Sequence, residues 1–149
     1  MSQQLSGQDA RQVSIQSVLG QLAALEDYIS RLQAALNELE TRIAVLDAAE
    51  KALYTIEDNA EILTPLDGVG DVYARAKILE SGKVIYHVGL DIYIELPRDK
   101  VVELIREERA SIARIADMYR RELAQASQYY ASLRAVVEQA MSRAQQRQG

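Results

Sequence analysis

Few side chains in this sequence could do chemistry, and they do not converge. His87 is the only histidine, and cysteine is absent, which excludes disulfides and thiolate metal sites. His87 stands in an alternating apolar run, on the opposite face from the apolar residues, which favours a surface position over a metal or catalytic role. No nucleophile can be paired with a base, and no carboxylate pair or ligand cluster can be assembled. The sequence therefore predicts no enzyme, no metal site and no cofactor site.

Three further motifs are better explained without chemistry. The stretch "DGVGD" at 67–71 carries two glycines but completes no phosphate-binding or dinucleotide-binding motif, so a turn is favoured. Tyr129 and Tyr130 are adjacent and point in different directions on a helix, which favours one packed residue beside a half-exposed neighbour over base stacking. Arg120 and Arg121 fit a solvated face. The net charge of −5, with acids and bases interspersed, gives no electrostatic footprint for nucleic acid.

The composition favours long helices over a compact core. The 149 residues include no Trp or Phe, and aromatic residues make up only 5% of the chain. The N-terminal residues have no basic start followed by an apolar run, and no stretch approaches the ~18 apolar residues of a membrane span. Together with the absence of cysteine, these features predict a soluble, cytoplasmic protein with no membrane partner.

The first third of the chain carries the apolar seam of a coiled coil. Apolar residues recur there in alternating steps of three and four: Ile15, Val18, Leu22, Leu25, Ile29, Leu32, Leu36, Leu39, Ile43 and Leu46. Glu50 interrupts the seam and Leu53 resumes it. A helix over residues 9–58 would be roughly 75 Å long, and it needs a partner along its whole seam.

The last third of the chain is the expected partner. The same spacing gives a second seam, with further apolar residues one place on at Leu123, Tyr130, Val137 and Met141: Ile105, Glu108, Ile112, Ile115, Tyr119, Glu122, Ala126, Tyr129, Leu133, Val136 and Ala140. A helix over residues 98–146 would reach roughly 73 Å. Two arms of nearly equal length favour an antiparallel hairpin within the chain. The alternative is that each helix pairs with another chain.

The middle segment, 59–97, is predicted to form two β-hairpins. It holds both prolines, Pro65 and Pro97, and four of the seven glycines, between short β-branched runs. We expect the second hairpin to fold back at Gly89-Leu90. With the helices occupied by each other, the apolar sheet face is left uncovered and should serve oligomerisation. The expected oligomerisation residues are Ile62, Leu66, Val72, Ala74, Val84, Tyr86, Val88, Ile92 and Ile94.

The whole layout resembles the α-class subunit of prefoldin. The similarity is most specific in "PLDGVGDVYARAKI" followed by "KVIYHVGLDIYIE", since two hairpins are typical of the α class and one of the β class. The resemblance implies a mostly α, α+β fold in one domain, whose hairpins join an oligomeric β-barrel. It implies a hexamer with β-class subunits, two α and four β. It also implies an ATP-independent chaperone that captures non-native polypeptides at the coiled-coil tips and passes them to a group II chaperonin.

Because the chain enters and leaves the helices at the hairpins, both termini should lie at the free tip. The expected client-binding residues there are Val13, Ile15, Val18, Leu19, Val136, Val137, Ala140 and Met141. Ordinary coiled-coil packing is the alternative explanation for these residues. The alternative function is a structural scaffold or assembly subunit that binds one defined protein partner.

Overall fold

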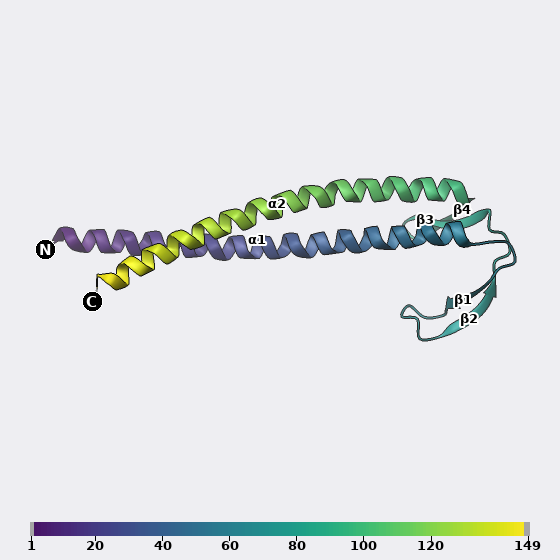
Figure 1. Cartoon of the computed structure of the whole chain (residues 1–149), viewed down its shortest axis with the longest axis horizontal. Coiled ribbons are helices and arrows are strands. Elements are labelled where there is room, and N and C mark those ends of the chain that lie inside the picture. Colours follow the sequence, from purple (N-terminus) through teal and green to yellow (C-terminus); the bar gives the residue numbers. More distant parts are fainter. Residues whose placement is uncertain (1, 148–149) are drawn as a thin grey trace. The chain divides into compact units, whose positions relative to one another are not determined.

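The structure, a computed structural model, describes the backbone of residues 2–147 and the side chains of residues 14–147. Two long helices form a hairpin with two β-hairpins between them, which confirms the predicted fold class (Figure 1). The elements are α1 (Ser2–Thr55), β1 (Glu61–Pro65), β2 (Tyr73–Lys77), β3 (Lys83–Gly89), β4 (Ile92–Pro97) and α2 (Arg98–Gln146). The chain divides into two compact units, one of residues 1–39 with 114–149 and one of residues 40–113.

In the first unit, α1 buries the seam that its sequence predicts. The described seam positions from Ile15 to Leu39 are all buried or half-buried, and Leu32 is only 7% exposed. On α2, by contrast, the buried and half-buried positions are Ala116, Tyr119, Glu122, Leu123, Ala126, Tyr130, Leu133, Val137 and Ala140. The main predicted row was therefore wrong at Ile115, Tyr129 and Val136, while Leu123, Tyr130 and Val137, which the sequence placed one position on, belong to the seam. Ile115, Tyr129 and Val136 are exposed at the flank of the seam.

Two neighbouring rows of residues on α2 could face α1, one through Leu123 and one through Glu122, and the carboxylate of Glu122 disfavours the second row. Glu122 belongs to the alternative row, and burying its carboxylate against Leu or Ile would cost several kcal/mol. At the flank, the same carboxylate stays accessible and accepts a hydrogen bond of 3.0 Å from the Tyr28 hydroxyl. Ala116 and Ala126 are buried and small, so they allow α1 and α2 to approach closely. Glu122 and Leu123 are both half-buried, and the hydrogen bond from Tyr28 satisfies the carboxylate at the edge of the seam.

The second unit has a small core between the helices and one hairpin. Its buried residues are Leu46 from α1 and Val101 and Ile105 from α2. The hydrophobic residues that pack against this cluster are Ala49, Leu53 and Ile112 from the helices and Val84, Tyr86 and Leu96 from β3 and β4. The expectation that the helices leave the whole apolar sheet face uncovered is therefore wrong for the second hairpin. Because β4 runs directly into α2, this hairpin folds back onto the helices that it joins.

The turn of the second hairpin lies one residue later than expected. The residues Leu90 and Asp91 form it, with φ values of 50° and 58°, as two-residue hairpin turns require. Gly89, at φ 112°, ends β3 after a register shift between His87 and Gly89. Gly89 therefore supplies the positive φ needed at the register shift in β3. Leu90 and Asp91, although they carry side chains, take the left-handed conformation of the turn.

The first hairpin closes through its own loop. Leu66 donates a backbone hydrogen bond of 2.9 Å to the carbonyl of Val72, and Asp67 Oδ1 accepts one of 2.7 Å from the backbone N–H of Gly70. The "DGVGD" stretch is thus a turn held by an aspartate side chain. Val72 lies in this loop, before β2 begins at Tyr73, and not on the strand as expected.

Hydrogen bonds tie the three chain segments that meet at the base of the helices. The Asp58 carboxylate accepts a bond of 2.6 Å from the backbone N–H of Ser81, which holds the pKa of that carboxyl below its ordinary range. The backbone N–H of Arg98 donates to the carbonyl of Gly82 at 2.8 Å, and its guanidinium donates to the carbonyl of Ile56 at 3.3 Å. The end of α1 and the start of α2 are therefore both bonded to the connections between the hairpins.

The packing of Leu32 leads to a first prediction. We expect Leu32→Ala to lower the free energy of unfolding by about 2–5 kcal/mol, because a buried leucine leaves a cavity. Leu19→Ala is the control, since Leu19 is 47% exposed on the same helix and its truncation should cost less than about 1 kcal/mol. Urea unfolding followed by circular dichroism measures both changes. Equal costs for the two variants would show that the seam assignment of Leu32 is mistaken.

Candidate interaction surfaces

The exposed apolar side chains of this chain concentrate in the β-hairpins. Among the residues whose side chains are described, 22 large hydrophobic residues are exposed, and 13 of them lie between Ile62 and Ile94. They are Ile62, Leu63, Leu66, Val69, Val72, Tyr73, Leu79, Ile85, Val88, Leu90, Ile92, Tyr93 and Ile94. Such a density of apolar surface in one short segment is typical of a surface that another chain covers.

The two hairpins present this surface differently. In the second hairpin, Ile85 and Tyr93 lie on the face opposite the helices, and they are 74% and 62% exposed. The rings of His87 and Tyr93 lie 4.8 Å apart on the same face, where the sequence placed His87. None of the residues packed on the Leu46 cluster comes from β1 or β2. In the first hairpin, the face with Leu63 and Tyr73 is exposed, and on the other face Thr64, Ala74 and Ala76 are half-buried.

The residues predicted for oligomerisation fall into two groups. The structure leaves Ile62, Leu66, Val72, Val88, Ile92 and Ile94 exposed and Ala74 half-buried. Val84 and Tyr86 instead pack on the helices of their own chain. The sequence missed Leu63, Ile85 and Tyr93, since only the strand register shows that these residues share the outer faces.

The residues predicted at the coiled-coil tip also divide. Ile15, Val18 and Ala140 are half-buried and Val137 is buried, so these four belong to the seam. Leu19, Val136 and Met141 are exposed, at 47%, 57% and 56%. Val13 lies outside the residues whose side chains are described. Among the side chains described at the terminal end of the coiled coil, these three large apolar ones are exposed beside a packed seam.

A charged layer interrupts the seam in the second unit. Glu50 is 9% exposed, and its two carboxylate oxygens accept hydrogen bonds of 2.6 Å from Arg106 and of 2.6 Å from Arg109. Arg109 also bonds to Asp47, and Arg106 donates to the Tyr54 hydroxyl at 2.7 Å. The hydrogen bond from Arg106, followed by that from Arg109, holds the pKa of Glu50 below its ordinary range despite desolvation. We call Asp47, Glu50, Arg106 and Arg109 the Glu50 layer.

The sequence showed Glu50 as an interruption but missed the arginines that pair with it. Arg106 and Arg109 stand three residues apart on α2 and so share one face of a helix, which was the available signal.

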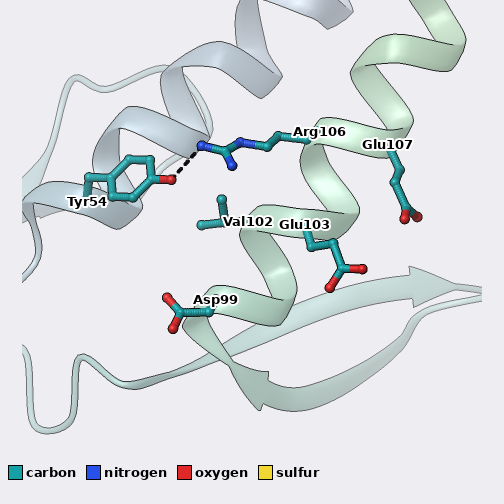
Figure 2. A pocket seen from close by; sticks show the side chains of 6 residues that line it. All are labelled: Tyr54, Asp99, Val102, Glu103, Arg106 and Glu107. Carbon is teal, nitrogen blue, oxygen red and sulfur yellow. Dashed lines mark hydrogen bonds between the residues drawn. The ribbon is translucent and has the colours of Figure 1, made fainter.

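A hollow of about 360 Å³ opens beside this layer (Figure 2). Tyr54 comes from α1, and the rest of the lining comes from the first turns of α2: Asp99, Val102, Glu103, Arg106 and Glu107. The Tyr54 hydroxyl accepts its hydrogen bond from Arg106, and no lining residue is a nucleophile beside a base. No group of three or more potential metal ligands occurs among the described residues. The helices of the described part also lack the length and apolar character needed to cross a membrane.

Comparison with known proteins agrees with this architecture. The profile of the Prefoldin subunit family matches residues 25–143. A Hyperthermus butylicus protein described as prefoldin subunit alpha is 40% identical over 140 residues, which cover 93% of this chain and 91% of the relative. The chain belongs to the prefoldin family.

Two further prefoldin relatives support the α-class assignment. An Aeropyrum pernix prefoldin subunit alpha is 33% identical over 114 residues, which cover 74% of each chain. A Sulfurisphaera tokodaii prefoldin subunit alpha is 27% identical over 136 residues, or 91% of this chain and 90% of the relative. The resemblance stated from the sequence is thereby confirmed. Prefoldin subunits are non-enzymatic chaperone subunits, which confirms on family grounds that the chain is no enzyme.

The exposed hairpin surface of this prefoldin subunit leads to a second prediction. Ile92→Lys should abolish assembly with a β-class prefoldin subunit and leave the helical circular dichroism unchanged, because a charge would be buried in the contact. Val45→Lys is the matched control, since Val45 on α1 is 52% exposed and Ile92 is 54% exposed. Native mass spectrometry reads the assembly. Intact complexes with Ile92→Lys would place the contact elsewhere.

The ion pairs of Glu50 lead to a third prediction, on pH. A carboxyl whose pKa is lowered by folding stabilises the fold above its unfolded pKa, and that contribution is lost as the pH falls through the lower folded value. We therefore expect the native chain to lose stability steeply below about pH 4.5, the ordinary value for glutamate. Glu50→Gln should be less stable at pH 7 and should show a shallower loss in that window. Urea titrations at several pH values measure this. Parallel pH profiles for both chains would contradict it.

Proposed function

We propose that this chain is the α subunit of an ATP-independent chaperone of the holdase type, assembled with β-class prefoldin subunits as two α and four β. The family match over residues 25–143 carries this proposal. The 13 exposed hydrophobic residues of the hairpins support it, because the helices pair within the chain and leave the hairpins as the apolar surface for assembly. In the hexamer, the hairpins would form the shared β-barrel body.

Non-native polypeptides are bound at the terminal end of the coiled coil. Leu19, Val136 and Met141 supply exposed apolar area there, and a flexible methionine suits contacts with many different sequences. Three such side chains form no deep pocket, so one subunit binds weakly. Several subunits held in one assembly bind the same client tightly through effective concentration.

The bound client is then passed to a group II chaperonin in the cytoplasm. A weak, distributed contact suits such a transfer, because each tip releases the client without a large barrier. The absence of cysteine suits a reducing compartment.

A structural scaffold with one defined protein partner is the second candidate. The Glu50 layer favours it in one respect, because a polar layer that specifies pairing is typical of coiled coils built for fixed assemblies. The two candidates differ in whether the terminal end of the coiled coil protects unfolded chains in general.

The fourth prediction separates these candidates. A complex whose α chain lacks residues 1–14 and 138–149 should keep its subunit composition and protect a diluted, denatured model protein less well, with no dependence on ATP. Light scattering at equal hexamer concentration measures protection. The milder change Val136→Ser with Met141→Ser should act in part, since each substitution removes roughly 1–2 kcal/mol of apolar contact.

The control for the milder change is Val45→Ser with Met118→Ser, which removes two side chains of similar exposure outside the terminal end. Equal protection by the native and truncated complexes would move the client site away from this end and favour the scaffold.

A further inference from the structure

The seam of α1 contains a single charged residue. Of its twelve positions from Ile15 to Leu53, eleven are Leu, Ile or Val and one is Glu50. A glutamate at such a position costs stability in comparison with leucine, even when it is paired. Its presence in the most regular part of the chain therefore needs a reason other than stability.

The apolar seams alone do not define how α1 and α2 align. The α1 seam repeats Leu and Ile with a seven-residue period, so sliding α1 by one heptad matches apolar residues with apolar residues again. The connection between the helices opposes this through hydrogen bonds, which join Ser81 to Asp58 and Arg98 to Ile56, but not through apolar packing. β4 runs directly into α2, but α1 joins the rest through residues 56–60 and the first hairpin, none of which packs on the Leu46 cluster.

The Glu50 layer distinguishes the observed alignment from both neighbours. In the structure, Glu50 meets Arg106 and Arg109. A slip of one heptad in one direction would put Ala113 and Ala116 in the places of those arginines. A slip in the other direction would put Asp99 and Val102 there. Glu50 would be buried without a cation in the first case and would lie beside a carboxylate in the second.

A second ion pair between α1 and α2 is also possible only in the observed alignment. Arg42 on α1 donates hydrogen bonds of 3.1 and 2.8 Å to Glu108 on α2. One heptad either way along α2, the residue in the place of Glu108 is Ile115 or Val101, and neither can accept a hydrogen bond through its side chain. The contacts of Glu50 and of Arg42 with α2 are thus satisfied only in the observed alignment.

We propose that the Glu50 layer is a register lock, which selects one antiparallel alignment of α1 and α2 from alternatives that would still match apolar residues with apolar residues. The lock fixes which residues of α1 stand opposite which residues of α2, and with them the seat of the β3–β4 hairpin on Leu46, Val101 and Ile105. The layer selects the observed alignment by destabilising the slipped ones, because those alignments bury Glu50 without a cationic partner. This inference does not depend on the proposed chaperone function.

The absence of native cysteine allows a direct test by crosslinking. Tyr28 on α1 donates a hydrogen bond to Glu122 on α2. In an antiparallel pair, the residues one heptad nearer the chain termini, Gln21 and Tyr129, therefore stand opposite each other. Gln21→Cys with Tyr129→Cys reports the observed register. Gln21→Cys with Val136→Cys, or with Glu122→Cys, reports the two slipped registers, which differ from it by about 10 Å. A short bismaleimide joins the thiols in the full-length chain, and gel electrophoresis and mass spectrometry quantify the product.

The lock is removed with Glu50→Leu and Arg109→Leu, which make the buried part of the layer apolar and leave only the more exposed charges of Asp47 and Arg106. With the native layer, we expect the slipped pairs to crosslink at least about tenfold more slowly than the observed pair, as an unpaired buried charge requires. With the apolar layer, at least one slipped pair should approach the rate of the observed pair, at unchanged helical circular dichroism and an unchanged or higher Tm. Asp27→Asn with Arg31→Gln is the control, because it removes an exposed ion pair within α1 and should leave the register alone.

The charge-swapped variant Asp47→Arg, Glu50→Arg, Arg106→Glu, Arg109→Glu reverses every charge of the layer, tests the pairing itself and should restore the preference for the observed pair. Exclusive crosslinking of the observed pair in the apolar variant would overturn the proposal, because the register would then be set by the hairpins or by packing. Loss of helical circular dichroism in the apolar variant would also overturn it, since the layer would then be needed for folding and not for alignment.

Discussion

The fold depends on the burial of one long apolar stripe. A helix such as α1, with Leu or Ile at almost every seam position, is stable in water only when that stripe is covered. α2, from the same chain, covers this stripe, and the two seams bury each other. The second hairpin packs on the Leu46, Val101 and Ile105 cluster. Other apolar residues of the hairpins, such as Leu63 and Ile85, stay exposed in the described part of the chain.

Much of this could be predicted from the sequence, because the strongest signals are periodic. The α1 seam follows from the heptad pattern alone, and α2 begins where Pro97 forbids an earlier helix start. The sequence left the α2 seam spread over two adjacent rows, because Tyr129 and Tyr130, or Val136 and Val137, are equally apolar. A helix considered alone has no preference between such rows. The partner helix and the carboxylate of Glu122 decide it.

The sites were harder to predict for a related reason. Val84 and Tyr86 look like any apolar residues of an exposed hairpin, and only the return of β3 and β4 onto the helices buries them. Gly89 looked like the turn, yet Leu90 and Asp91 make the turn because the strand irregularity takes the glycine. The partners of Glu50 lie more than 50 residues away in sequence, so no local pattern could pair them. The roles of these residues are decided by contacts between distant segments of the chain and not by local sequence propensities.

The unequal packing of the two hairpins bears on how the subunit assembles. The second hairpin gains part of its stability inside the chain through Val84, Tyr86 and Leu96, so it is formed and oriented before any partner arrives. The first hairpin has only its own ladder and the loop held by Asp67, and an isolated two-stranded hairpin is marginal in water. A partner chain that covers Leu63 and Tyr73 would therefore supply much of the stability of the first hairpin.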